Sequence, residues 1–219
     1  MNMLKYFFGA MPPPRPTTKR ERRYGLLARV LVLGPALVLA LALWSLPLPS
    51  AGQASSGNST ASATEERVKA AFLFKFPNYV EWPAAAFAQT DSPYVIGVIG
   101  EEAILEELRR ISAGRSINNR AVTIKKLQPG ESLTGIHVLF IGANDRGRQA
   151  QVLTQANMLP ILLVTETEGA LAQGSMINFR IADDRVRFEA SLVAAEKAGL
   201  KLSSRLLAIA ISVVKGSQK

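Results

Sequence analysis

The sequence predicts an α/β fold: a single three-layer domain in which helices flank a mixed, mostly parallel sheet, with a hairpin and helices at the C-terminal end. Short apolar runs and amphipathic stretches alternate between residues 94 and 165, as in strands joined by helices. The run over 160–165 is almost entirely apolar, which is typical of a strand covered on both faces. Residues 176–191 alternate apolar and polar positions around Asp183 and Asp184, which indicates an antiparallel hairpin.

The first helix of the domain is predicted from Val68 onward, where apolar residues recur at helical spacing. Pro77 interrupts this pattern. Because proline removes the hydrogen bond to the carbonyl of Leu73, we expect the helix to kink or end there.

The remaining elements are predicted from the spacing of apolar residues, which differs between helices and strands. Strands are predicted over 94–99, 120–127, 136–141 and 160–165, and helices over 101–111 and 145–157. Residues 192–214 are predicted to form two helices broken near Gly199, the second capped by Ser203 or Ser204.

Residues 1–54 have the composition of a signal peptide. A basic segment precedes the apolar run 30–46, and a tract of small residues follows that run. We expect Sec-type export to the periplasm with cleavage after Ala54, and a disordered lead over 55–64 before the domain of 65–219. An uncleaved membrane anchor stays open, and so does Tat export through the pair Arg22 and Arg23.

The charge of the whole chain, +9, belongs largely to this leader. Seven of the 26 Lys and Arg residues and one of the 17 acidic residues precede residue 55. The remaining chain carries 19 basic against 16 acidic residues, too even a balance for a surface that neutralises many phosphates. We therefore expect no nucleic-acid partner.

Catalytic and metal-binding patterns are missing from the sequence. The chain has no cysteine, so disulfides, thiolate nucleophiles and cysteine metal sites are excluded. His137 is the single histidine and lies in an apolar strand, where a structural role is expected. The acidic residues are scattered, so we expect neither an enzyme nor a cofactor or metal. One alternative is the turn over 142–147, whose amides could face an anion.

The segment 68–83 is the most informative one, since it holds five of the fifteen aromatic residues. Most of them are expected to form core, because an aromatic-rich helix can simply anchor a sheet. Trp82 and Pro83, next to Glu81, could instead line a groove for a ligand or partner.

Two blocks of this sequence resemble the signature of the YfiR-like family of periplasmic proteins. The first block is Lys69 to Leu73 with Phe76, Tyr79, Val80, Glu81, Trp82 and Pro83. The second runs from Ile177-Asn178-Phe179 through Arg187-Phe188-Glu189, Ala194-Ala195 and Gly199-Leu200 to the run from Ser203 to Leu207. Together the blocks bracket residues 65–214. Pro77 departs from the family pattern, and the cysteines of some members are absent, so redox control through disulfides is excluded.

The resemblance implies a periplasmic, non-enzymatic regulator. Such a protein binds the outer domain of an inner-membrane diguanylate cyclase and inhibits it, which lowers cyclic-di-GMP and biofilm formation. A periplasmic small-molecule binding protein is the alternative, and a second copy of the chain and a small ligand stay open as further partners. The residues implied in binding a partner or ligand are Phe76, Tyr79, Glu81, Trp82, Pro83, Asn178, Arg187, Glu189, Ser203 and Ser204.

Overall fold

The structure is a computed structural model and describes residues 56–156 and 158–216. The predicted signal peptide, its cleavage site and residue 55 lie outside this range.

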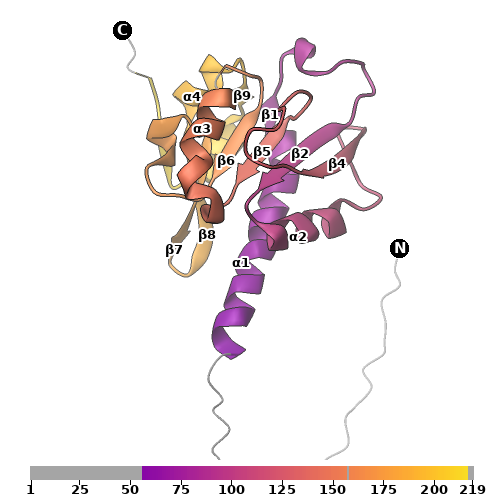
Figure 1. Ribbon diagram of the computed structural model, residues 1–219. Helices are drawn as coiled ribbons and strands as arrows, with labels where there is room; N and C mark the ends of the chain where they lie inside the picture. Colours follow the sequence, from indigo (N-terminus) through magenta and orange to yellow (C-terminus); the bar gives the residue numbers. More distant parts are fainter. Residues whose placement is uncertain (1–55, 157, 217–219) are drawn as a thin grey trace, which may run out of the picture. The chain divides into compact units, whose positions relative to one another are not determined.

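An eight-stranded sheet forms the centre of the domain, in the order β10-β8-β7-β6-β5-β2-β4-β3 (Figure 1). Its strands are β2 (Tyr94–Ile99), β3 (Ser116–Ile117), β4 (Arg120–Lys126), β5 (Val138–Ile141), β6 (Leu162–Thr165), β7 (Ile177–Ala182), β8 (Arg185–Ser191) and β10 (Ser212–Val214). Neighbouring strands are parallel except for the pairs β7–β8 and β3–β4. The predicted mixed, mostly parallel sheet is therefore confirmed.

In the described part of the chain, five α-helices accompany the sheet: α1 (Ser56–Lys75), α2 (Glu102–Ser112), α3 (Arg146–Ala156), α4 (Leu192–Lys197) and α5 (Ser204–Ala208). Helix α1 packs against α2, and its Phe72 ring lies 5.7 Å from the ring of Phe188 on β8. The crossovers β2–α2–β4 and β5–α3–β6 step in opposite directions along the sheet. Because such crossovers are right-handed, α2 and α3 cover opposite faces, which gives the predicted three layers.

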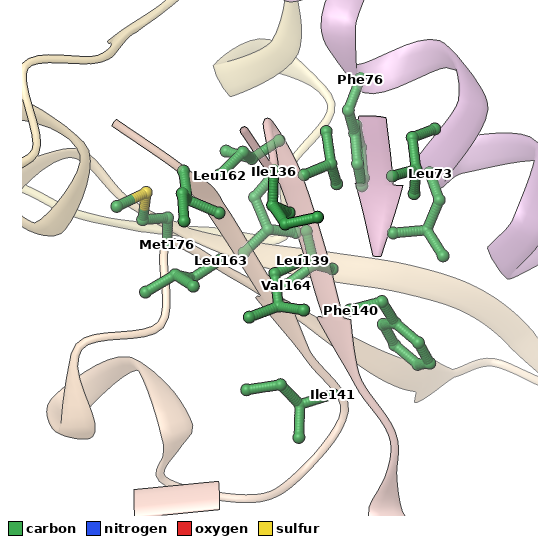
Figure 2. Packing of buried hydrophobic residues seen from close by; sticks show 14 of the residues in the cluster. Leu73, Phe76, Ile136, Leu139, Phe140, Ile141, Leu162, Leu163, Val164 and Met176 are labelled. Carbon is green, nitrogen blue, oxygen red and sulfur yellow. The ribbon is translucent and has the colours of Figure 1, made fainter. Parts of the chain in front are cut away.

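The core gathers on the two central strands and the helix that covers them. All four residues of β5 and all four of β6 are buried. Figure 2 shows Leu73 of α1 and Phe76, the first residue after α1, together with side chains from these two strands. An aromatic cluster fixes α1 on the hairpin, with ring centroids 5.5–6.1 Å apart; its members are Phe72, Phe76, Phe140, Phe179 and Phe188.

Most predicted elements are found within two residues of their expected bounds. Helix α1 ends at Lys75 and passes into the 3₁₀ turn η1 (Phe76–Tyr79), as the proline at position 77 predicts. Asp183 and Asp184 turn the β7–β8 hairpin with φ of +50° and +54°, the left-handed pair that a two-residue hairpin loop requires.

Two expectations are corrected. Helix α1 begins at Ser56, so residues 56–64 are helical where a disordered lead was expected. The Ser62 hydroxyl donates to the Glu66 carboxylate at 3.0 Å, and an established helix extends at low cost into small residues. The second correction concerns the C-terminal end, where α5 is only five residues long and 212–214 form strand β10. Two of the three residues of β10 are valine, which suits a strand beside β8 better than a helix.

Candidate functional site

The two sequence blocks meet in a small second sheet. Strands β1 (Val80–Glu81) and β9 (Lys201–Leu202) pair antiparallel, with Glu81 opposite Lys201. The Ser203 amide also donates to the Tyr79 carbonyl at 2.9 Å. Segments more than 100 residues apart in the sequence thus form one surface.

Local signals in the sequence build this junction. Pro77 lies in the first turn of η1, which directs the chain out of α1 into β1. At the other block, Gly199 has φ of +71°, and the Leu200 amide donates to the Ala195 carbonyl. This glycine-ended turn closes α4 and leads into β9. Ser203 then caps α5, because its hydroxyl accepts from the Leu206 amide at 3.3 Å.

The outer side of the junction is open to solvent. We call it the block surface; its members are Tyr79, Glu81, Pro83, Lys201 and Ser204, all exposed. The side chains of Glu81 and Lys201 are 79% and 82% exposed, and their charged atoms lie 3.9 Å apart. A pair so exposed adds little stability. Both side chains are therefore available for contacts with another molecule.

Trp82 anchors the junction to the main sheet. Its ring packs edge-on against Tyr94 at 5.4 Å and against His137 at 6.4 Å. Its Nε1 atom is buried and has no hydrogen-bond partner within the described part of the chain. The half-buried ring packs against the core and supports the block surface from below.

His137 has the structural role that the sequence predicts. Its Nδ1 atom accepts from the Val95 amide at 3.1 Å, so the proton is on Nε2, which donates to the Ala86 carbonyl at 3.2 Å. Burial lowers the pKa of His137; the Ala86 bond opposes this, and the charge of Arg120 adds to it. The neutral ring ties the segment after Trp82 to strands β2 and β5.

The other predicted residues lie elsewhere. Phe76 is a member of the aromatic cluster and is 1% exposed. Asn178, also 1% exposed, accepts from the Thr165 hydroxyl and donates to Glu189 at 3.3 Å. Arg187 is exposed on β8, opposite Arg180 of β7. The sequence blocks therefore combine core, a buried polar network and the block surface, and only the last is accessible as one patch.

An ionic cluster beneath α1 was not recognised from the sequence. Lys69, with only 10% of its side chain exposed, contacts Glu166 at 2.5 Å and also pairs with Glu65. The second oxygen of Glu166 accepts from the Ala143 amide at 2.7 Å. Burial would lower the pKa of Lys69, but the hydrogen bonds and charges of Glu166 and Glu65 raise it overall. Two features of the sequence could have indicated this cluster: Lys69 lies among the core positions of a helix, and Glu166 comes directly after strand β6.

Glu101 belongs to the same region, at the carboxyl end of β2. Its carboxylate accepts from the Asn144 side chain at 2.8 Å. Burial raises the pKa of Glu101, and the nearby charge of Glu166 raises it further. The turn expected to offer amides to an anion is thus occupied in part by the protein's own carboxylates.

Residues 66–211, about two thirds of the chain, match the model of a protein family described as YfiR/HmsC-like. The chain belongs to the YfiR/HmsC-like family. No curated protein matches the chain at a significant level.

The YfiR/HmsC-like family is one of periplasmic regulators and is not known for enzymatic activity. In the part of this family member that the structure describes, no helix is long and apolar enough to cross a membrane. The matched region contains both sequence blocks and the block surface, and it includes Lys69 and Glu166 of the ionic cluster.

Proposed function

We propose that this chain is a periplasmic, non-enzymatic regulator that binds the outer domain of an inner-membrane diguanylate cyclase and holds the cyclase inactive. Lower cyclic-di-GMP and less biofilm follow from this activity. Membership in the YfiR/HmsC-like family is the observation that carries the proposal.

The block surface supports protein contact as its mode of action. It carries an exposed aromatic ring, a proline and charges of both signs on a backbone that two antiparallel strands hold in place. Aromatic side chains on such a fixed base are typical centres of protein interfaces. Exposed charges at the rim of an interface set orientation and association rate.

The cellular test is the level of cyclic-di-GMP after deletion of the gene, under conditions where the partner cyclase is present. We expect the level to rise and to return to normal when the gene is restored. An unchanged level would contradict the proposal. A neighbouring gene for a membrane protein with an outer loop and a diguanylate cyclase domain would identify the partner to use.

Glu81→Lys tests the block surface, since it reverses a charge that is almost fully exposed. We expect binding to the cyclase outer domain to weaken about tenfold, because the substitution reverses an exposed interface charge. Glu131→Lys is the matched control: Glu131 is exposed in the loop between β4 and β5, and the charge change is the same. Equal binding by both variants would mean that the block surface is not part of the interface. The proposal that the chain is a regulator would not be contradicted by that result.

Export by cleavage after Ala54 is part of the proposal. The mature protein should then begin at Ser55, which mass spectrometry of periplasmic extract would measure. Recovery of the full-length chain in the membrane fraction would favour the uncleaved anchor instead.

Small-molecule binding is a second candidate function, favoured by a polar hollow of about 380 Å³. Lys69, Glu101, Arg146 and Glu166 line it together with α1 residues. It lies at the carboxyl ends of β2 and β5, where the strand order reverses, the usual ligand position in such sheets. A ligand at a hundred times its Kd would add about 2.7 kcal/mol of stability. Thermal shifts with amino acids, nucleotides and sugars would detect it, and an unmoved Tm with all of them would exclude these classes.

A further inference from the structure

A hollow of about 760 Å³ lies between helix α1 and the β7–β8 hairpin. We call it the hairpin hollow; Figure 1 shows α1 continuing beside the tip of this hairpin. Its α1 wall carries residues at helical spacing, of which Ala61, Val68 and Phe72 are apolar. Its hairpin wall includes Ile181 and Val186, which lie opposite each other in the strand register. Pockets for small molecules have this size, about 300–1,000 Å³, and are lined mostly by apolar side chains.

The hairpin hollow is closed by packed rings at one end, and its apolar walls are exposed toward the other. Phe72 lines the hollow and packs against Phe188, with ring centroids 5.7 Å apart. One helical turn earlier, Val68 is 37% exposed. Ile181 is 53% exposed, although the alternation along β7 places it on the same face as the buried Phe179. These side chains therefore lie on the core side of their elements and still expose apolar surface, which an apolar ligand would cover.

Two arginines line the hairpin hollow without a counter-ion. Arg185 and Arg187 form no ion pair and no side-chain hydrogen bond within residues 56–156 and 158–216. Arg187 also lies directly opposite Arg180, and like charges in this position repel each other. Asp184 in the turn balances one of these charges, and Glu65 on the α1 wall has its own basic partner one helical turn away. The surplus charge of this wall is therefore positive, and an anionic group beside the arginines would reduce the repulsion.

We propose that the hairpin hollow binds an anionic amphiphile with a single alkyl chain, such as a fatty acid. The chain end lies at Phe72, and the carboxylate lies at Arg185 and Arg187, because arginine binds carboxylates through two parallel hydrogen bonds. The α1 wall from Ala61 to Phe72 is about 16 Å long at about 1.5 Å per residue. This length is roughly half of the ~30 Å hydrocarbon core of a bilayer, and thus close to that of one acyl chain.

The first test is isothermal titration calorimetry of the chain purified from the periplasm, with laurate below its micelle concentration. We expect one laurate to bind per chain. Octanoate should bind at least about tenfold more weakly, because it buries fewer CH₂ groups. Dodecanol, the uncharged counterpart of laurate, should also bind at least about tenfold more weakly, because it has no carboxylate for the arginines. Absence of laurate binding, or affinity that is equal for laurate and dodecanol, overturns the proposal.

Ile181→Glu tests the place of binding. It puts a negative charge on the apolar wall, so we expect the affinity for laurate to fall at least about tenfold. Ile209→Glu is the matched control, because Ile209 is similarly exposed, at 56%, and does not line the hairpin hollow. Both positions are exposed, so both variants should fold, and their melting temperatures would verify this. Equal laurate affinity of the two variants would place the ligand elsewhere and overturn the proposal.

The role of the arginines is tested by a chain that carries Arg185→Gln and Arg187→Gln together. Laurate and dodecanol should then bind this variant about equally, because the carboxylate has lost its partners. A chain with Arg115→Gln and Arg205→Gln is the control, since both of these arginines are exposed and lie outside the hollow. A preference for laurate that persists in the first variant, or disappears in the control, contradicts the proposal. None of these outcomes depends on whether the chain regulates a cyclase.

Discussion

His137 shows how much one buried side chain can connect. Both ring nitrogens are engaged, one by the Val95 amide and the other by the Ala86 carbonyl, and the Phe87 ring stacks on the imidazole at 4.4 Å. The Arg120 guanidinium lies over the Phe87 ring, 4.1 Å from the centre of that ring. The residues after Trp82 are held to the sheet by this arrangement.

His137 should make stability dependent on pH. Its pKa in the folded state is lowered, so the unfolded chain binds the proton first, at the ordinary value of about 6.5. Stability is therefore complete above about pH 6.5 and decreases as pH falls through that value toward the folded pKa. We expect a larger fall in Tm between about pH 7.5 and about pH 5.5 in the natural chain than in His137→Gln. Identical pH profiles of the two proteins would contradict this assignment.

Glu166 is the residue on which the ionic cluster depends. Glu166→Gln keeps the acceptor for the Ala143 amide but removes the charge beside the buried Lys69. We expect a loss of about 1–3 kcal/mol in the free energy of unfolding, because Lys69 keeps only the more exposed Glu65 as its partner. Urea denaturation measures this loss. Glu168→Gln is the control, as Glu168 is exposed two residues further on, and a similar loss in both variants would rule out the explanation.

At the scale of elements, short segments owe their positions to caps and turns. Helix α5 has five residues, too few to be stable by itself. The Ser203 cap, the β1–β9 pairing and burial of Leu206 hold it in place. These contacts also define the shape of the block surface.

The cap on α5 can be tested with two neighbouring serines. Ser203→Ala removes the acceptor for the Leu206 amide and should cost about 1 kcal/mol in the free energy of unfolding. Ser204→Ala, at the exposed first residue of the helix, should leave that free energy nearly unchanged. Thermal or chemical denaturation of the two variants compares them directly. A greater loss in Ser204→Ala would mean that the cap is assigned to the wrong serine.

At the scale of the whole molecule, the aromatic cluster joins the two ends of the domain. Phe76 follows α1, and its ring lies 6.0 Å from Phe179 and 5.5 Å from Phe188 on the hairpin. The end of the first helix and the β7–β8 hairpin are therefore packed against each other. A substitution at Phe76 should therefore lower the stability of the whole domain.

Phe76→Ala should lower the free energy of unfolding by about 3–5 kcal/mol, since it leaves a cavity among packed rings. The unfolding should remain a single transition, measured by circular dichroism in denaturant. Val68→Ala, on the preceding helix α1, is the control: Val68 is partly exposed, and its loss should cost less than about 1 kcal/mol. Equal effects of the two substitutions would contradict the central position of Phe76.

The sequence by itself determined the fold class and most of the longer elements. The apolar runs of β5 and β6, the period of the hairpin and the proline after α1 act locally, so they can be recognised without the tertiary structure. The structural role of His137 also follows from its apolar neighbours in the sequence. The two blocks indicated the family before their positions in space were known.

Only the tertiary structure decided which of these residues face solvent and which face one another. Glu81 meets Lys201, and Lys69 meets Glu166, because the sheet brings together segments that are far apart in the chain. Pairings of this kind depend on strand order, which periodicity does not specify. The same reason explains why a helix was wrongly predicted at the C-terminal end. Residues 212–214 form a strand because they pair with the free edge of β8, and the local sequence pattern does not indicate which strand lies beside them.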